Sequence, residues 1–533
     1  LFTIDETVNA IKNLDKGKSD GRIGLFSDHV INGTSKLYDF ITKLFNAMLI
    51  HGISPSDMLS SVMLPIPKNK RLSSKCSANF RAICLQSVLC KVLDIMILNR
   101  EISKLNTSEL QFGFKRKHST ALAASVMLET IDYYLNNGGT VYGVSLDATK
   151  AFDRVEFARM FELLINREIN PLYVRLIKNM YVKQKMCVRY GEVYSEWFTA
   201  SNGVKQGGVL SPTLFSVYLD GMLLQLDKSN VGCYVGDKFC GVVGYADDVI
   251  LLAPSRTAMC RMISICEEYA DKFCIKFNGS KSKCIVFHKN KVNSIYDPEF
   301  VVNDQKVPFV TELEYLGYRI YANRDEPMVD NVVRDFNCKF NCFIGDLSCV
   351  SSEVKGKLFN TYCSSLYGGI FSSMYDKSLD KLGVAWRKAQ RRLYKLPYTT
   401  HSRLLPFICD ILPHDVIIHS RFLNHVISGM NHDNSIVKYL FRMCLGTQLS
   451  RTGFNLLTLC EIYNLDRETL HLRSRNFINN IVKNGRIGSA LDCDISNACQ
   501  IKELVRFRDL DFNHEFLLNT EEINEIIRYL CTK

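Results

Sequence analysis

The sequence lacks the features that would direct a chain to or through a membrane. It has no N-terminal basic segment followed by an apolar one, the pattern of a secretory signal, and no apolar run of bilayer length. It has 20 cysteines but neither a CxxC pair nor a CCHC knuckle, which excludes the common zinc modules. A long chain without a signal segment is expected in a reducing compartment, where cysteines stay free.

Two pairs of cysteines have spacings that raise the question of metal binding. Cys338 and Cys342 lie at helical spacing, and we expect them to be packing residues rather than metal ligands. Cys493 and Cys499 have His514 downstream, but their spacing matches no zinc module. The cysteines therefore predict no metal centre.

Internal repeats and low-complexity tracts are absent as well. Hydrophobic residues make up 47% and charged residues 23% of the 533 residues, a globular composition with enough apolar material for large cores. This length predicts two to four domains. The formal net charge of +11 permits binding to a polyanion, and such binding would have to come from local clusters.

Hydrophobic periodicity and turn residues divide the chain into expected elements. Thr3 and Glu6 have capping-box spacing before an apolar face, which predicts a helix over 3–14. A Gly- and Lys-rich loop over 16–21 lacks P-loop spacing and is interpreted as an exposed turn. The further expected elements are a strand over 62–67, an amphipathic helix from Arg81 to about Arg100, a strand over 141–147, helix over 156–184 and a hairpin over 241–253.

Strand signals fade near residue 325 and helical signals dominate from there on. Basic clusters follow at 387–392 and 471–475. The first surrounds Trp386 with helical spacing, which fits either a helix lying along phosphates or an ordinary solvated face. We predict three regions: an N-terminal helical extension over 1–59, a mixed region over 60–325 and a mostly helical region over 326–533.

Two acidic sites carry the chemistry that the sequence suggests. Asp147 ends a hydrophobic strand, while Asp247 and Asp248 lie at the tip of an apolar hairpin. Carboxylates beside buried strands are costly unless something neutralises them. Three carboxylates can hold two magnesium ions about 3.5–4 Å apart, one activating an attacking hydroxyl and the other stabilising a leaving pyrophosphate. An Asp-Asp pair in a turn is usually just solvated, so each site alone is a weak signal.

The surrounding motifs make the signal specific. Tyr245 and Ala246 precede the acid pair as in the Tyr/Phe-x-Asp-Asp box of reverse transcriptases. Further boxes resemble that family in order and spacing: fingers motifs at 67–83 and 111–120, the first catalytic box at 146–153, the Gln-Gly motif at 202–212, and later palm motifs at 279–283 and 314–317. The pattern most resembles reverse transcriptases of non-LTR (LINE-type) retrotransposons of the jockey and chicken-repeat kind. Stretches at 384–389, 396–406 and 529–532 extend the resemblance nearly end to end.

The resemblance implies an α+β right-hand polymerase. Fingers and palm, with an antiparallel palm sheet, would occupy 60–325, and a helical thumb with a C-terminal nucleic-acid-binding region would follow. It implies an RNA-directed DNA polymerase that copies the element's RNA by target-primed reverse transcription with two Mg²⁺ ions, or Mn²⁺ as a substitute. The implied partners are RNA template, DNA primer or target DNA, dNTPs and the element's other protein, without a membrane. Nucleus and cytoplasm are the expected locations.

The same resemblance assigns roles to single residues. The three acids would bind the metals, and the carbonyl of Ala148 would face one of them. Lys281, or else Lys283, would be a general acid near the leaving pyrophosphate. The triphosphate and the nucleotide pocket would be contacted by Lys68, Arg81, Phe152, Gln206, Gly207 and Tyr245, and the primer strand would be supported by Tyr315, Leu316 and Gly317.

Several of these roles have a physical sense and a simpler alternative. The ring of Phe152 matches a steric gate that would clash with a ribose 2′-hydroxyl, although outside the motif it would be interpreted as a core aromatic. Lys68 and Arg81 suit a triphosphate, yet such residues also occur on any solvated basic face. Gly207 lacks a side chain and would let the backbone approach closely.

The sequence also departs from the family. The loop over 18–22 lacks the prolines that many relatives have there, and no ribonuclease H acid set is evident in the C-terminal half. Because the chain starts at Leu1, we expect a fragment or processed piece without the family's endonuclease, unable to nick target DNA. The alternatives are a maturase-type reverse transcriptase and a degenerate or domesticated copy that binds nucleic acid without polymerising.

Overall fold

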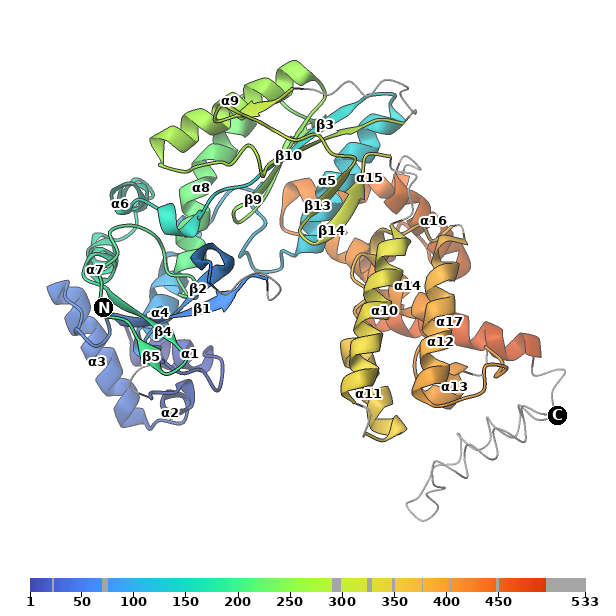
Figure 1. The fold of residues 1–533 in the computed structure, drawn as a ribbon, viewed down its shortest axis with the longest axis horizontal. Helices are drawn as coiled ribbons and strands as arrows, with labels where there is room; N and C mark the ends of the chain where they lie inside the picture. The colour runs from blue at the N-terminus through green and yellow to red at the C-terminus, as the bar shows by residue number, and fades with distance from the viewer. Residues whose placement is uncertain are drawn as a thin grey trace, which may run out of the picture. The chain divides into compact units, whose positions relative to one another are not determined.

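The structure is a computed structural model that describes residues 1–21, 24–69, 75–289, 299–323, 328–347, 350–375, 377–402, 405–446 and 450–494. The chain divides into two compact units (Figure 1). Unit 1 comprises residues 1–127, 140–286 and 292–310, and unit 2 comprises residues 128–139, 287–291 and 311–533. Helices and strands occur together, so the predicted α+β class is confirmed. The division into three functional regions stays a prediction.

Unit 1 contains two four-stranded sheets and the helices up to residue 272. These helices are α1 (Ile4–Lys12), α2 (Ser27–Ile31), α3 (Ser35–His51), α4 (Val88–Leu105), α5 (Thr120–Asn136, shared with unit 2), α6 (Phe157–Asn166), α7 (Pro171–Val182), α8 (Ser211–Lys228) and α9 (Arg256–Lys272). Helix α1 begins as its sequence predicts, because Thr3 and Glu6 form the expected capping box.

The first sheet has the strand order β2-β1-β4-β5. Its strands are β1 (Ser60–Pro67), β2 (Phe80–Leu85), β4 (Lys185–Tyr190) and β5 (Val193–Tyr194). Strand β1 pairs antiparallel with β2 and parallel with β4. The predicted strand over 62–67 is therefore confirmed. The basic residues Lys70 and Arg71, which follow it in the sequence, lie outside the described residues.

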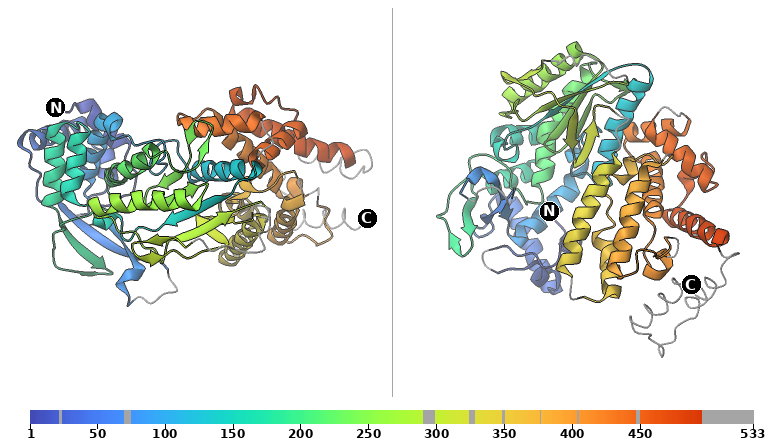
Figure 2. Two further views of the ribbon diagram at one scale, coloured as in Figure 1. Left: turned by 90° about the horizontal axis from the view of Figure 1, so that it is seen from above. Right: turned by 45° about the vertical axis from the view of Figure 1, so that its right-hand side comes forward.

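The second sheet has the order β10-β3-β9-β8 and carries the predicted acids. Its strands are β3 (Val141–Leu146), β8 (Val242–Tyr245), β9 (Asp248–Ala253) and β10 (Lys283–Phe287). Strand β9 pairs antiparallel with both β3 and β8, which confirms the predicted strand and hairpin. Helix α9 packs on β3 and β9, while α8 packs on β8 and on α9 (Figures 1 and 2). The remaining short strands are β6 (Tyr234–Val235), β7 (Lys238–Phe239), β11 (Val301–Val302) and β12 (Gln305–Lys306).

Two predicted helices were wrong in their extent. The segment from Phe80 forms strand β2 before the chain turns into α4, because pairing with β1 overrides the local helical pattern. The expected helix over 156–184 is broken into α6 and α7. Glu168 adopts a φ of 57°, and Asn170 caps the second helix ahead of Pro171, so the chain stops and restarts there.

Unit 2 is mainly helical, as expected from the sequence after residue 325. Its elements are the hairpin β13 (Glu312–Tyr315) and β14 (Tyr318–Tyr321), and the helices α10 (Val329–Asp346), α11 (Ser352–Tyr362), α12 (Asp380–Leu393), α13 (Leu405–Cys409), α14 (His414–Met430), α15 (Ser435–Gly446), α16 (Arg451–Ile462) and α17 (Arg475–Asp494). An aromatic cluster of Phe336, Phe359 and Trp386 joins α10, α11 and α12.

Sixteen cysteines of the described residues form no disulfide. Cys338 and Cys342 are exposed on α10, so their prediction as packing residues was wrong. The apolar stripe of this helix is formed instead by phenylalanines such as Phe336 and Phe340. Cys499 and His514 lie outside the described residues. Among the helices that the structure describes, none combines the length and apolarity needed to cross a bilayer.

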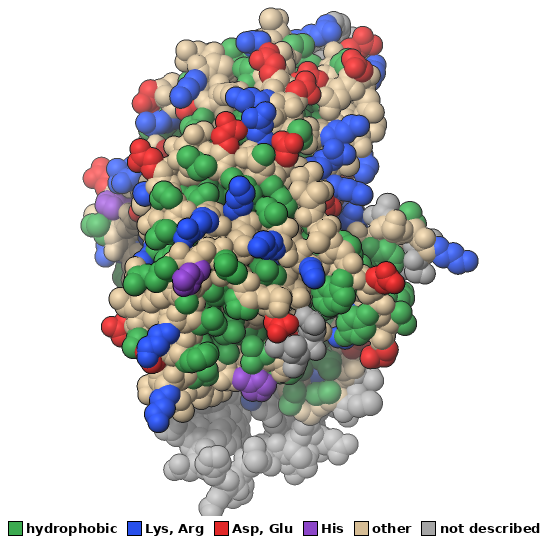
Figure 3. All heavy atoms as spheres, turned by 90° about the vertical axis from the view of Figure 1, so that its left-hand side faces the viewer, with side chains coloured by type: hydrophobic (Ala, Val, Ile, Leu, Met, Phe, Trp, Pro, Cys, Tyr) green, Lys and Arg blue, Asp and Glu red, His purple; other side chains and the backbone are tan. Residues whose placement is uncertain are grey.

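Figure 3 shows the charged side chains on one face of the molecule. On the face drawn in Figure 3, Lys and Arg side chains are spread among hydrophobic side chains and carboxylates. Nucleic-acid recognition therefore has to be argued from individual residues rather than from net charge alone.

Candidate active site

The three predicted acids lie at neighbouring strand ends in unit 1. Leu146 pairs with Val249 across the β3–β9 ladder. One step further along this register, Asp147 comes opposite Asp248, the first residue of β9. Residues opposite one another in an antiparallel pair have Cα atoms about 4.5–5.5 Å apart. The fold thus brings together carboxylates that are about a hundred positions apart in the sequence.

The backbone of Asp147 is tied to a distant turn. Its carbonyl accepts a hydrogen bond from the N–H of Asn278 at 2.9 Å. Its own N–H donates to the hydroxyl of Ser282 at 3.1 Å, and that hydroxyl donates to the Asn278 carbonyl at 2.8 Å. Lys281 is exposed in the same turn, while Lys283 begins β10. The structure therefore brings the two candidate general acids to the segment that holds Asp147.

The pKa values of Asp247 and Asp248 are both raised. Desolvation, together with the charges of Asp247 and Asp147, raises the pKa of Asp248 to about 6. Desolvation also raises the pKa of Asp247, and the charge of Asp147 adds to the rise. The guanidinium of Arg81 opposes both shifts. Arg81 thus lies within electrostatic reach of the acids, as its predicted role requires.

The three carboxylates suit a Mg²⁺ ion that is also bound by the phosphates of a substrate. Among the described residues, no three His, Cys, Asp or Glu side chains converge closely enough to hold a metal by themselves. Mg²⁺ usually keeps several waters and is bound by one or two carboxylates plus substrate phosphates, so open carboxylates fit it. Ala148 forms an antiparallel bridge with Phe277. Its hydrogen bonds use the N–H of Thr149 and the carbonyl of Asp147, so this bridge does not use the Ala148 carbonyl.

The Gln-Gly motif packs against strand β2. The carbonyl of Gln206 accepts a 2.6 Å hydrogen bond from the N–H of Cys84. Gly207 adopts a φ of +110°, and a Cβ there would lie 2.8 Å from the Cys84 carbonyl oxygen. Arg81 lies three residues before Cys84 on the same strand. The motif and the predicted triphosphate ligand are therefore joined through one strand, and Gln206 stays partly exposed.

The predicted steric gate is held by other aromatic rings. Phe152 stacks on Phe215 with ring centroids 4.5 Å apart, and it meets Phe114 edge-on at 6.4 Å. The carbonyl of Phe152 accepts from the N–H of Val204 at 2.9 Å, which fixes this turn to the Gln-Gly loop. The ring is only partly buried, so it can line a pocket.

Two further predicted ligands are exposed or partly exposed at the site. Lys68 ends the β1–β2 ladder, where its N–H donates to the Asn79 carbonyl at 2.7 Å. Burial raises the pKa of Asp153, and the charges of Lys150 and Lys68 oppose this rise, so Lys68 lies near the catalytic-box turn. Tyr245 pairs with Asp248 at the end of the β8–β9 hairpin and is partly exposed.

The predicted primer-support residues belong to unit 2. Tyr315 ends β13, and the turn that follows has φ values of 52° at Leu316 and 80° at Gly317. The hydroxyl of Tyr367 donates to the Leu316 carbonyl at 2.8 Å, while its ring stacks on Tyr318 at 4.4 Å. Tyr367 thus holds this turn within unit 2.

The basic helix α12 uses part of its charge internally. Trp386 is buried, and its indole N–H donates to the Leu412 carbonyl at 3.1 Å. Arg391 donates to the Thr400 carbonyl at 2.8 Å and Arg392 to the side chain of Asn341 at 2.9 Å. These two arginines therefore have a structural role, whether or not the helix also contacts phosphates.

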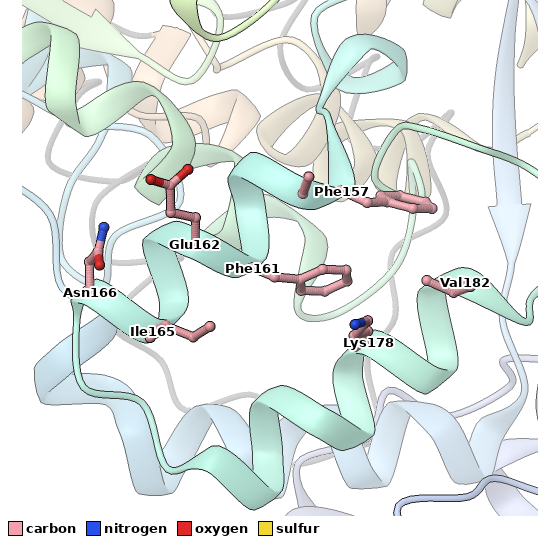
Figure 4. Close-up of a pocket in the computed structure, with 8 residues that line it drawn as sticks. Phe157, Phe161, Glu162, Ile165, Asn166, Lys178 and Val182 are labelled. Atoms are coloured by element: carbon pink, nitrogen blue, oxygen red, sulfur yellow. The ribbon is translucent and has the colours of Figure 1, made fainter.

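A surface groove between α6 and α7 lies outside this constellation. It encloses about 480 Å³ and is lined mostly by apolar side chains, with Phe161 and Lys178 from the two helices facing it (Figure 4). None of the predicted site residues lines it. The groove therefore takes no part in the chemistry assigned to the acids.

Sequence reasoning did not identify several supporting residues. Ser282 and Asn278 hold Asp147, and Gln111 contacts the hairpin tip. Gln111 and Ser282 lie within boxes that were recognised, but their bonds join segments 135 residues apart, which no local pattern reveals.

Comparison with known proteins agrees with this geometry. Residues 66–320 match the family described as "Reverse transcriptase (RNA-dependent DNA polymerase)". The chain is 22% identical over 418 residues to the RNA-directed DNA polymerase from mobile element jockey of Drosophila melanogaster, covering 75% of this chain and 45% of that protein. It is 26% identical over 286 residues to the Pol polyprotein of the retrotransposable element R2DM of the same species, covering 52% and 27%. The chain thus spans less than half the length of these curated relatives.

A solved structure was also found. The telomerase of Candida albicans in complex with a telomeric RNA fragment has a TM-score of 0.39 and 11% sequence identity, covering 87% of this chain and 68% of that chain.

Proposed function

Because residues 66–320 match the family described as "Reverse transcriptase (RNA-dependent DNA polymerase)", we propose that this chain extends a DNA primer on an RNA template. The observation that carries the proposal is the placement of Asp147, Asp247 and Asp248 at neighbouring strand ends of one sheet. The Gln-Gly loop and the strand of Arg81 pack beside one another in the same unit. Carboxylates that can hold metal ions and a guanidinium within electrostatic reach of them are what nucleotidyl transfer needs.

The proposed reaction is an in-line attack of the primer 3′-hydroxyl on the α-phosphate of a dNTP, with pyrophosphate leaving. Asp147, Asp247 and Asp248 would hold two magnesium ions, which when bound activate the hydroxyl and neutralise the developing phosphate charge. Arg81 and Lys68 would bind the triphosphate, since a guanidinium fork and an ammonium both suit phosphate oxygens. Lys281 would donate a proton to the leaving pyrophosphate.

The remaining residues would shape the substrate. Gln206 and Gly207 would line the nucleotide pocket together with Tyr245, and the Phe152 ring would exclude a ribose 2′-hydroxyl. The turn of Leu316 and Gly317 would support the primer strand. Support for the Phe152 role comes from its stack on Phe215, which keeps the ring in one orientation.

The wider biological role follows from the same premise. We propose that the template is the RNA of a non-LTR retrotransposon and that the primer is the 3′-end of nicked target DNA, as for a target-primed enzyme. The element's other protein would be a partner, with activity in the nucleus and cytoplasm. A substrate with a pre-formed nick tests the priming step, because the chain should extend from that nick and not from an intact duplex.

The experiment that tests the polymerase is dNTP incorporation on a primed homopolymer RNA with Mg²⁺. Asp247→Asn combined with Asp248→Asn removes both charges at nearly constant shape, and we expect incorporation to fall by at least about a hundredfold. Asp237→Asn is the matched control, because that exposed acid forms an ion pair with Lys238 on a separate hairpin. A folded parent that binds RNA in a salt-dependent way yet extends no primer would instead be a nucleic-acid-binding copy without polymerase activity.

A further inference from the structure

The segment from Leu110 to Gly113 runs beside strand β8. The N–H of Gly244 donates to the Leu110 carbonyl at 2.9 Å, and the N–H of Phe112 donates to the Gly244 carbonyl at 2.7 Å. Gln111 faces Gly244 in this parallel bridge, and its side chain is completely buried. The segment therefore borders the strand that leads into the acid-bearing tip.

One oxygen atom of Gln111 fastens that tip. Its side-chain Oε1 accepts a hydrogen bond from the N–H of Ala246 at 2.9 Å and another from the N–H of Gly113 at 2.9 Å. Ala246 adopts a left-handed φ of 56°, a conformation that costs about 1 kcal/mol or more for a residue with a Cβ. The side-chain Nε2 of Gln111 has no hydrogen-bond partner within the described part of the chain. The acceptor oxygen is thus the functional half of the amide.

The approach of the two segments leaves no space for adjustment. A Cβ on Gly113 would lie 2.4 Å from the backbone nitrogen of Ala246. If the Gln111 oxygen were removed, two buried N–H groups would lose their acceptor, which is costly in an interior. The tip relieves that cost by moving its backbone, and the residues after Ala246 in the chain are the two acids.

We infer that Gln111 is a positioning residue that fixes Asp247 and Asp248 for metal binding. The expected effect of Gln111 on catalysis rests on the proposed function. Its effect on the position of the two carboxylates does not depend on that function. Residues that orient metal ligands typically change metal affinity about 10- to 100-fold when they are replaced. A displacement of the tip by about 1 Å is expected to slow extension by about a hundredfold.

The test compares the full chain with Gln111→Met and Gln111→Glu. Methionine has a similar shape but no acceptor oxygen, whereas glutamate keeps one in either protonation state. Mn²⁺ is the probe, titrated by electron paramagnetic resonance in the presence of dNTP and without primer, and primer extension is measured in parallel over a range of dNTP concentrations. Gln111→Met should bind Mn²⁺ about 10- to 100-fold more weakly and extend about a hundredfold more slowly, with the KM for dNTP unchanged. Gln111→Glu should bind Mn²⁺ about as tightly as the parent.

Gly113→Ala provides a second route if the methionine variant does not fold. It leaves Gln111 intact but pushes on Ala246 from the same side, so it should weaken Mn²⁺ binding in the same way. Mn²⁺ binding by Gln111→Met or Gly113→Ala equal to that of the parent would overturn the inference, even if the parent polymerises. A parent that binds Mn²⁺ in a Gln111-dependent way but extends no primer would support the inference and refute the polymerase.

Discussion

Replacing Gly207 by alanine should damage the nucleotide pocket while leaving the fold intact. The residue has a φ of +110°, outside the range that side chains tolerate, and the new Cβ would lie 2.8 Å from the Cys84 carbonyl oxygen. That oxygen belongs to the backbone of β2 and cannot rotate away as a flexible side chain could. The loop must therefore move off the strand that carries Arg81.

The size of the effect follows from the strain. A residue with a Cβ held in such a conformation costs about 1–3 kcal/mol, and the close contact places Gly207→Ala toward the upper end. We expect the loop to release about 2–3 kcal/mol of this strain when it moves out of the conformation that binds dNTP. The population of the binding conformation then falls about 30- to 150-fold. The kcat/KM for dNTP in primer extension should fall by the same factor, since each 1.4 kcal/mol is tenfold.

Gly191→Ala is the matched control. Gly191 also has a positive φ, +61°, but a Cβ there meets nothing within 4 Å. It should lower the melting temperature slightly and leave dNTP kinetics unchanged. The reasoning is refuted if Gly207→Ala retains the parental kcat/KM. It is also refuted if Gly191→Ala loses activity to the same degree, because a positive φ alone, without a close contact of the new Cβ, would then explain the loss.

Two further predictions follow from the same geometry. Phe152→Ala should lower discrimination against ribonucleotides by at least about tenfold, measured as the ratio of kcat/KM for dNTP and rNTP, and an unchanged ratio would remove the steric-gate role. Burial raises the pKa of Asp94 to about 6, against the hydrogen bond from Gln86 and the charge of Lys205. An acid with a raised pKa stabilises the fold fully below its unfolded pKa and loses that contribution as pH rises through about 6. Asp94→Asn should therefore gain up to about 3 kcal/mol relative to the parent between pH 4 and pH 7.5 in chemical unfolding, and a pH-independent difference would contradict the shift.

The acids and their strands could be predicted because their signals are local. We could recognise the hydrophobic run that ends in Asp147, and the hairpin with its Asp-Asp tip, without knowing which segment packs against them. The capping box at Thr3 could be recognised for the same reason. Strand β2 was missed because its identity depends on pairing with β1, which occupies a separate stretch of sequence. The break between α6 and α7 depends on a single left-handed residue, Glu168, whose side chain gives no warning of it.

The residues that hold the acids in place could not be predicted from the sequence, for a more general reason. Ser282 binds the N–H of Asp147, and Gln111 binds the N–H of Ala246, each across 135 residues. In both cases a polar side chain recognises a backbone atom. Backbone atoms carry no sequence identity, so nothing at the receiving position indicates which partner it needs.

The apolar core, rather than the acids, determines where the acids lie. Residues Val249 to Ala253 of β9 are completely buried, as are Val141 and Val144 of β3. Because side chains alternate between sheet faces, a slip of one residue in the β3–β9 register would turn this apolar set away from its packing partners. The register is therefore fixed by the core, and Asp147 and Asp248 come opposite one another one step beyond its end. At that position the carboxylates remain accessible, which limits the cost of gathering three negative charges until a cation and a triphosphate neutralise them.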